Sequence, residues 1–298
     1  LFRSSVDRTG LVESARQAIE ALADHVVFYD EDPTTEQEVI ARAKDAEVLL
    51  VSWRTQVPKS VIESLPKLKY IGMCCSLYDE KSANVDIAFA RELNIPVYGV
   101  RDYGDEGLVE FILSALIGLF HGFGRHQWSA VQEELTGKTL GIVGIGATGQ
   151  MLAERARAFG MDVVYFSRTR KLEIEHEGLR YLPLNELMAQ ADVISTHVPK
   201  FTQIITKEAL LATKDKAILV NTSLEPTFDL KAFDNWIQSP GHYAIFDRGG
   251  LGAYLETLTQ YERVIYTEKV TGFTHQATYR LSKKVVDNLQ RFINLKMD

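Results

Sequence analysis

The chain has 298 residues, of which 46% are hydrophobic and 24% charged, and this balance excludes a disordered or low-complexity protein. Its 33 Lys and Arg against 40 Asp and Glu give a formal charge of -7, without the basic surplus of a general nucleic-acid binder. The longest apolar stretch, residues 108–120, is interrupted by Glu110 and is shorter than the roughly 20 residues that cross a bilayer. We therefore expect a protein that binds neither nucleic acid nor a membrane. The adjacent Cys74 and Cys75 form no disulfide framework and suggest a reducing, cytoplasmic compartment.

The first hundred residues alternate between helical and strand-like apolar spacing. Helices are expected at residues 13–23, 35–43, 61–65 and 83–93, and strands at residues 25–29, 47–51, 68–73 and 95–100. Helices that alternate with strands through short connections predict βα units and a parallel sheet.

A polar loop at residues 101–107 interrupts this alternation and marks a domain boundary. A long apolar helix follows at about residues 108–120. A second series of strands is expected at residues 139–143, 162–166, 192–197, 217–221, 243–247 and 264–267, with helices between most of them. A last helix is expected at about residues 275–295. The fold class is therefore α/β, with two parallel-sheet domains.

Three glycines open the second series, because Gly144-Ile-Gly146-Ala-Thr-Gly149 follows a β-rich run and begins an amphipathic helix. The first glycine permits a tight turn, the second lets the backbone approach a pyrophosphate, and the third lets helix and strand pack closely. The helix N-terminus adds free N–H groups and the positive end of its dipole. Strand, glycines, helix and following strand agree in spacing, so we interpret the segment as a dinucleotide-binding turn.

The end of the next strand distinguishes between the two nicotinamide cofactors. An acidic residue there, about 20 residues beyond the glycines, binds the ribose 2′-hydroxyl of NAD. This chain instead has Ser167, Arg168, Thr169, Arg170 and Lys171. Guanidinium groups bind phosphate oxygens through paired hydrogen bonds, so the cluster favours the 2′-phosphate of NADP(H) over NAD(H). A solvated basic turn is the alternative.

Several short runs, in matching order and spacing, resemble the D-isomer-specific 2-hydroxyacid dehydrogenase family. Residues 135–146 are similar to the start of the family's nucleotide domain, and residues 191–199 and 217–222 are similar to two of its later strands. Residues 66–71 and 84–88 match the family's N-terminal domain.

This resemblance implies two doubly wound parallel-sheet domains, a flavodoxin-like substrate domain and a Rossmann dinucleotide-binding domain. The substrate domain is expected to comprise residues 1–103 and 275–298, and the NAD(P)-binding domain residues 104–274. The resemblance also implies an active site between the domains and a homodimer. Cofactor contacts are assigned to Gly144, Gly146, Ala147, Thr148, Gly149, Ser167, Arg168, Thr169, Arg170, His197, Val198, Pro199, Thr202, Thr222, Ser223, Asp247 and Gly272.

The residues that carry the family's catalysis have changed. The family holds the substrate carboxylate with an Arg, protonates the carbonyl with a His and orients that His with a Glu. Leu224 stands here at the arginine position and Lys269 at the histidine position, while Arg248 follows Asp247 where the sequence has no Glu-Pro pair.

Three cations are candidates for a rebuilt site. Lys269 can supply a proton or stabilise a developing alkoxide, and Arg248 and Arg54 can hold a carboxylate. This favours an NADP(H)-dependent oxidoreductase that acts on a small, anionic, carboxylate-bearing 2-oxo or 2-hydroxy compound. A cofactor-binding sensor or scaffold without turnover is the alternative, in which these cations are ordinary surface charges. No metal site is expected.

Overall fold

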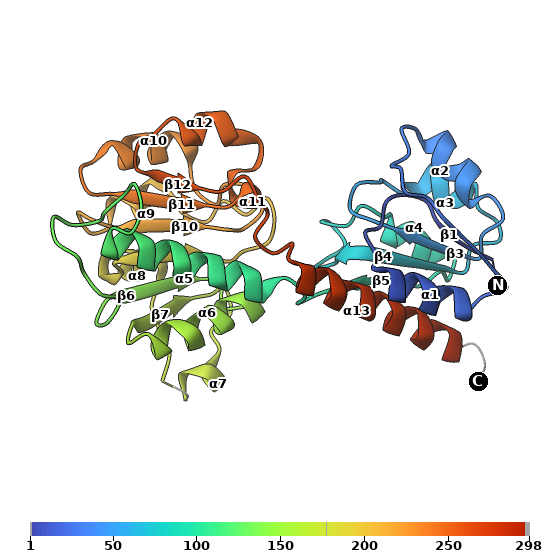
Figure 1. Ribbon diagram of the computed structural model, residues 1–298, viewed down its shortest axis with the longest axis horizontal. Coiled ribbons are helices and arrows are strands. Elements are labelled where there is room, and N and C mark those ends of the chain that lie inside the picture. The colour runs from blue at the N-terminus through green and yellow to red at the C-terminus, as the bar shows by residue number, and fades with distance from the viewer. Residues whose placement is uncertain (1, 177, 296–298) are drawn as a thin grey trace. The chain divides into compact units, whose positions relative to one another are not determined.

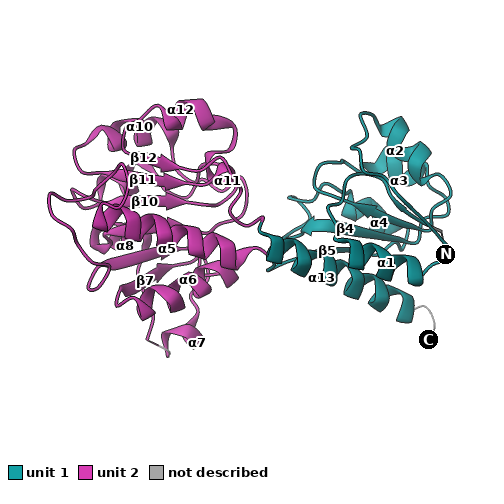
Figure 2. Cartoon of the chain, viewed as in Figure 1, with its two compact units in different colours: residues 1–103, 274–298 teal, residues 104–273 magenta. Residues whose placement is uncertain are grey.

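The computed structural model describes residues 2–176 and 178–295. The chain divides into two compact units (Figure 2), of which unit 1 comprises residues 1–103 and 274–298, and unit 2 comprises residues 104–273. Residues 1 and 296–298 of the expected substrate domain, and residue 177 of the expected nucleotide domain, lie outside the described residues.

Unit 1 contains a five-stranded parallel sheet with the order β2-β1-β3-β4-β5 (Figure 1). This is the flavodoxin-like order, in which the direction of strand addition reverses beside β1. The strands are β1 (Phe2–Ser5), β2 (His25–Phe28), β3 (Val48–Val51), β4 (Tyr70–Ser76) and β5 (Val97–Val100). The helices are α1 (Glu13–Ala21), α2 (Glu36–Ala43), α3 (Lys59–Glu63), α4 (Ile87–Glu92) and α13 (His275–Asn294).

Residue spacing does not predict the strand β1, because Arg3 and Ser4 within it are polar. Both side chains are nevertheless fully buried. Arg3 Nη1 donates a 2.8 Å hydrogen bond to the carbonyl oxygen of Ile19, and Nη2 donates to that of Leu22. The guanidinium therefore donates to carbonyl groups in the last turn of α1, where the intrahelical hydrogen bonds run out. Such a pairing between a strand and a helix end is not visible in residue spacing.

Alternate strand residues of unit 1 face two opposite layers of helices. Leu49 and Val51 belong to the apolar cluster formed with α2, α3 and α4, whereas Val48 and Leu50 belong to the cluster formed with α1 and α13. Figure 1 shows α1 and α13 on one side of this sheet and α2 and α3 on the other. A strand buried on both faces explains why β3 reads as a continuous apolar run.

Unit 2 contains a seven-stranded parallel sheet with the order β12-β11-β10-β9-β6-β7-β8. The strands are β6 (Thr139–Val143), β7 (Asp162–Phe166), β8 (Arg180–Tyr181), β9 (Val193–Thr196), β10 (Ile218–Asn221), β11 (Tyr243–Phe246) and β12 (Val264–Tyr266). The order reverses between β6 and β9, as in a Rossmann fold, and ligands of such sheets bind at the carboxyl ends of the strands near this reversal.

Helices cover both faces of the unit 2 sheet. They are α5 (Asp105–His121), α6 (Ala147–Ala158), α7 (Leu172–Glu175), α8 (Leu184–Gln190), α9 (Lys207–Leu211), α10 (Leu230–Gln238), α11 (Arg248–Leu251), the 3-10 turn η1 (Gly252–Tyr254) and α12 (Leu255–Thr259). One apolar cluster joins the sheet to α5 and α6, and a second joins it to α8, α9 and α10.

The expected fold class is confirmed, with differences at the ends of elements. The helix α5 begins at Asp105, within the stretch expected to be a loop. Asp105 and Glu106 in its first turn are stabilised by the positive end of the helix dipole, so a polar segment forms a helix start. Among the described residues, no helix is both long and apolar enough to cross a membrane.

Candidate active site

The glycine turn between β6 and α6 lies at the reversal point of the unit 2 sheet. Gly144 has φ +100°, and a Cβ there would lie 2.1 Å from the carbonyl oxygen of His197, which follows β9. A Cβ on Gly149 would lie 2.4 Å from the carbonyl oxygen of Gly144. Both positions therefore require glycine on steric grounds. Gly146 has nothing within 4 Å of its Cβ position, so the space beside it is open.

The first turn of α6 has the features of a pyrophosphate site. Gly146 is the N-cap and provides no side-chain acceptor, so N–H groups of the first turn remain available for an anion. Gly146 and Ala147 are exposed. Thr148, also in this turn, donates its hydroxyl hydrogen to the carboxylate of Asp105 at the start of α5. An open glycine position beside uncapped N–H groups fits a dinucleotide.

The loop after β9 contributes His197, Val198 and the exposed Pro199. His197 Nε2 lies 2.9 Å from Ser195 Oγ, and the Val198 N–H donates a 3.1 Å hydrogen bond to Ser223 Oγ. Burial lowers the pKa of His197 to about 4, so its ring is neutral at neutral pH. Thr202 lies further along this loop and is half-buried.

This pKa gives a pH-dependent contribution to stability. In the unfolded chain the His197 side chain has its ordinary pKa of 6.5, whereas burial in the folded chain lowers that pKa to about 4. The contribution of the neutral His197 ring to the free energy of unfolding is therefore complete above pH 6.5 and is lost as the pH falls toward 4. We expect the ring resonances of His197, followed by NMR, to stay unchanged down to about pH 5. A midpoint near 6.5 would contradict this assignment.

The basic turn after β7 keeps only some of its cations free. Arg170 donates from Nε to Glu175 Oε1 at 2.7 Å and from Nη2 to Glu175 Oε2 at 2.6 Å. Arg168 is exposed and has no ionic or hydrogen-bonding partner within residues 2–176 and 178–295. Ser167 is half-buried and Thr169 exposed beside it. Of the two arginines expected to meet a phosphate, Arg170 is therefore paired with Glu175, whereas Arg168 keeps a free head group. Residue spacing does not reveal the role of Glu175, because side chains five positions apart, as Arg170 and Glu175 are, do not share a face of a helix.

The loop after β10 forms a buried polar network with β9. Thr196 Oγ1 donates to Asn221 Oδ1 at 2.9 Å, and Ser223 Oγ donates to the carbonyl oxygen of Thr196 at 3.0 Å. Thr222 is 7% exposed, and its hydroxyl has no partner among the described residues. A buried hydroxyl without a partner at the carboxyl end of a Rossmann strand is consistent with a contact to the nicotinamide half of a dinucleotide.

Asp247 organises the segments after β11 and β12. Its Oδ1 accepts from the Gly250 N–H at 2.8 Å, and its Oδ2 accepts from the N–H and the hydroxyl of Thr271, each at 3.0 Å. Burial raises the pKa of this carboxyl group. Asp247, which the sequence analysis assigned to the cofactor, also holds the two loops together through these contacts. Gly272, next along the second loop, lies against Gly104.

Two of the three candidate cations lie on these loops. The Arg248 N–H donates a 3.1 Å hydrogen bond to the carbonyl oxygen of Lys269, which joins the two segments at the same edge of the sheet. Arg248 Nη1 donates to the carbonyl oxygen of Gly252 at 2.6 Å. Lys269 is exposed, and its ammonium has no partner in the described part of the chain. Lys269 is therefore the cation of this pair with a free head group.

Leu224, at the family's arginine position, is 50% exposed at the edge of this loop. Glu225 follows in the left-handed region with φ 70°, a conformation that costs a non-glycine residue about 1–2 kcal/mol. Its N–H donates to the carbonyl oxygen of Gly249 at 3.0 Å, and its Oε2 accepts from the Ala253 N–H at 3.3 Å. The carboxylate is therefore directed to the turn after α11, and an apolar side chain occupies the expected place of a positive charge.

Arg54, the third candidate, follows β3 in unit 1. Its Nη1 donates to the carbonyl oxygen of Arg8 at 3.1 Å, its Nε lies 3.8 Å from Asp32 Oδ2, and its Cζ lies 4.9 Å from the centre of the Trp53 ring. These contacts hold the guanidinium at the carboxyl edge of the unit 1 sheet, where ligands of doubly wound sheets bind.

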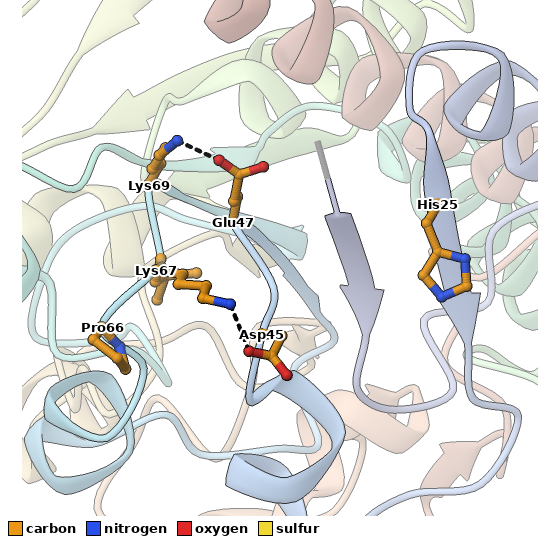
Figure 3. A pocket seen from close by; sticks show the side chains of 7 residues that line it. His25, Asp45, Glu47, Pro66, Lys67 and Lys69 are labelled. Atoms are coloured by element: carbon orange, nitrogen blue, oxygen red, sulfur yellow. Dashed lines mark hydrogen bonds and ion pairs between the residues drawn. The ribbon is translucent and has the colours of Figure 1, made fainter.

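An open hollow of about 890 Å³ lies at the opposite, amino-terminal edge of the unit 1 strands (Figure 3). Lys67 pairs with Asp45, and Lys69 pairs with Glu47, so its lysines are neutralised. This hollow is therefore a poor candidate for an anion site. Among the residues that the structure describes, no group of three His, Cys, Asp or Glu is placed to hold a metal ion.

Comparison with known proteins agrees with this geometry. Residues 120–246 match the model of the NAD binding domain of D-isomer specific 2-hydroxyacid dehydrogenases. A hydroxypyruvate reductase from Blautia hydrogenotrophica is 31% identical over 229 residues, which cover 70% of each chain. A glyoxylate reductase from Thermococcus litoralis is 30% identical over 280 residues, which cover 85% of this chain and 82% of the relative. The chain belongs to the D-isomer-specific 2-hydroxyacid dehydrogenase family.

The family assignment identifies the nicotinamide dinucleotide NAD(P) as the cofactor and places this chain among oxidoreductases. A solved structure, the acyclic imino acid reductase Bsp5 in complex with NADPH and D-Arg, has the same fold, with a TM-score of 0.83 and 23% identity over 99% of this chain and 98% of that one. The glycine turn, the uncapped α6 and the free Thr222 hydroxyl lie in unit 2, which contains the matched segment.

Proposed function

We propose that this family member is an NADP(H)-dependent reductase of a small carboxylate-bearing 2-oxo compound, with the corresponding 2-hydroxy compound as product. The observation that carries the proposal is the hydrogen bond from the Arg248 backbone N–H to the Lys269 carbonyl, because it fixes the backbone of Lys269, whose ammonium is free, at the strand edge that bears the dinucleotide motif. The relatives named glyoxylate and hydroxypyruvate reductase act on compounds of this class. In this proposal, residues 1–103 and 275–298 form the substrate domain and residues 104–274 the cofactor domain.

Separate residues hold the parts of the cofactor. The pyrophosphate is bound by N–H groups at Gly146, Ala147 and Thr148, while Gly144 and Gly149 keep the turn and helix close together. The exposed Arg168, with Ser167 and Thr169, binds the 2′-phosphate. The nicotinamide half lies against His197, Val198, Pro199, Thr202, Thr222, Ser223, Asp247 and Gly272. When bound, the reduced cofactor supplies a hydride to the substrate carbonyl carbon.

Lys269 acts as the proton donor in this proposal. Its ammonium transfers a proton to the carbonyl oxygen as negative charge develops there, and its positive charge stabilises that oxygen. Arg248 and Arg54 bind the substrate carboxylate from other positions, so the contact that the family arginine makes from position 224 is not restored for the simplest 2-oxo acids. The loss of one charge-assisted contact to a carboxylate weakens binding by about 1.5–3 kcal/mol. Glyoxylate, pyruvate and hydroxypyruvate should therefore react far more slowly than with an ordinary family member.

A spectrophotometric screen of carbonyl compounds for NADPH oxidation tests the activity. A slow reaction with pyruvate, glyoxylate and hydroxypyruvate and a faster one with another small carboxylate-bearing carbonyl compound is the expected result. Fast reduction of pyruvate or glyoxylate would overturn the idea of a rebuilt site. NADPH binding without turnover of any compound would support the alternative of a sensor or scaffold, which the loss of all three catalytic identities also favours.

A cytoplasmic homodimer is the expected assembly. The helix α5 carries Leu108, Phe111 and Ile117 as partly buried apolar residues, and we place it at or near the subunit interface. Light scattering at micromolar concentration should give twice the mass of one chain. A species with the mass of a single chain would contradict the dimer.

A further inference from the structure

Three residues hold the turn that follows β7, and none of them is among the side chains proposed to bind the 2′-phosphate. Tyr165, fully buried at the end of β7, donates its hydroxyl hydrogen to Glu175 Oε1 at 2.8 Å. The Lys171 N–H donates to the same hydroxyl oxygen at 3.0 Å. The hydroxyl therefore connects the last residue of the turn to the carboxylate of α7.

Arg170 completes this arrangement from the outer side. Its guanidinium binds both carboxylate oxygens of Glu175, and its Cζ lies 5.4 Å from the centre of the Tyr181 ring. The Glu175 side chain is only 17% exposed, whereas that of Arg170 is 56% exposed. Arg170 and the Tyr165 hydroxyl together lower the pKa of Glu175 to about 2, so it stays ionised at physiological pH.

We infer that Glu175, Arg170 and the Tyr165 hydroxyl form a positioning lock that orders residues 167–171 for the 2′-phosphate, and that Arg170 itself does not bind this phosphate. The inference rests on the proposed NADP(H) preference and extends it, since Arg168 is left as the free guanidinium of the turn. A bidentate pair fixes both the plane and the position of a guanidinium. A loop already ordered in its bound form loses less conformational freedom when the ligand binds.

The charge of Glu175 distinguishes this inference from a simpler interpretation, in which Arg170 binds the 2′-phosphate directly. If Arg170 were a direct ligand, removal of the Glu175 charge would free a cation and strengthen NADPH binding. If Glu175 positions the turn, the same change weakens NADPH binding although it removes a negative charge near the phosphate. The two interpretations predict opposite signs.

Dissociation constants for NADPH and NADH, measured by fluorescence titration of the full chain, test the lock. Glu175→Gln, Arg170→Met and Arg170→Lys should each weaken NADPH by about three- to tenfold, and the Glu175→Gln/Arg170→Met double variant should do no more than either. NADH binding should change by less than about twofold, because it has no 2′-phosphate. Arg180→Met, a neighbouring arginine that contacts Gln190 instead, is the matched control and should leave both constants unchanged.

Hydrogen exchange gives a readout independent of cofactor preference. The Lys171 N–H should exchange faster in Glu175→Gln and in Tyr165→Phe, which removes only the hydroxyl from a buried ring. Unchanged exchange, or tighter NADPH binding by Glu175→Gln, would overturn the lock. If the unmodified protein bound NADH and NADPH equally, the proposed cofactor preference would fail, whereas faster exchange in the two variants would still support the lock.

Discussion

The substitution Lys269→Met is expected to lower turnover of the best substrate by about 10²- to 10⁴-fold, the range for loss of a general acid. Methionine keeps the length of the side chain and removes its charge, so the developing alkoxide loses both its proton donor and its nearest cation. NADPH affinity should stay within about twofold, because the lost proton donor stabilises the transition state and does not contribute to binding of the cofactor in the ground state. Turnover rates and NADPH titrations on the same preparations measure both effects.

Lys216→Met is the matched control for this experiment. Lys216 is exposed and lies just before β10, at the amino-terminal edge of the strands, so the same change there should leave turnover unaltered. Robust activity of Lys269→Met on the best substrate would refute the role of Lys269. Equal losses from both lysine variants would point to a general effect of charge and not to proton donation.

The substitution Arg168→Asp is expected to weaken NADPH binding by about 10- to 100-fold, the effect of losing a charge-assisted contact. The new carboxylate repels the 2′-phosphate, yet it can accept a hydrogen bond from the free 2′-hydroxyl of NADH. NADH binding should therefore stay constant or improve. Titrations with both cofactors at a fixed salt concentration measure the preference directly.

Arg125→Asp controls for the change in net charge. Arg125 is exposed on the loop after α5, and the neighbouring Gln127 carbonyl accepts a hydrogen bond from the hydroxyl of Tyr243, the first residue of β11. This loop therefore lies at the amino-terminal edge, away from the glycine turn. Equal loss of NADPH and NADH affinity in Arg168→Asp would rule out specific recognition of the 2′-phosphate.

Residue spacing is sufficient to predict those parts of the fold that are built from apolar runs and the glycine turn. The bounds of β6 and β7 follow from the sequence because both are short, mainly apolar runs, the first ending at the glycine turn and the second at the polar segment that begins with Ser167. The strand β1 does not, since Arg3 is buried through hydrogen bonds to helix-end carbonyls that lie distant in sequence. Patterning detects burial of apolar surface and does not detect a polar group whose partners come from another element.

In the candidate site, too, some features can be predicted from the sequence and others depend on contacts formed in the fold. The steric need for glycine at positions 144 and 149 arises from local geometry, and the motif reveals it. The Arg170–Glu175 pair depends on how the turn into α7 folds, and the backbone link from Arg248 to Lys269 depends on which loops fold next to each other. Such contacts require the structure, and they decide which cations remain free to meet a substrate or cofactor.

The two units also differ in how they are assembled from the chain. Unit 2 is one continuous segment, whereas unit 1 combines the first hundred residues with α13, whose Leu281, Val285 and Leu289 complete the apolar cluster on one face of its sheet. During synthesis this face of unit 1 therefore stays uncovered until α13 has left the ribosome, whereas the opposite face is covered by helices from the first hundred residues. Unit 2 needs no segment from outside residues 104–273 to complete its core, so unit 1 depends on synthesis of the whole of unit 2 before its second face can be covered.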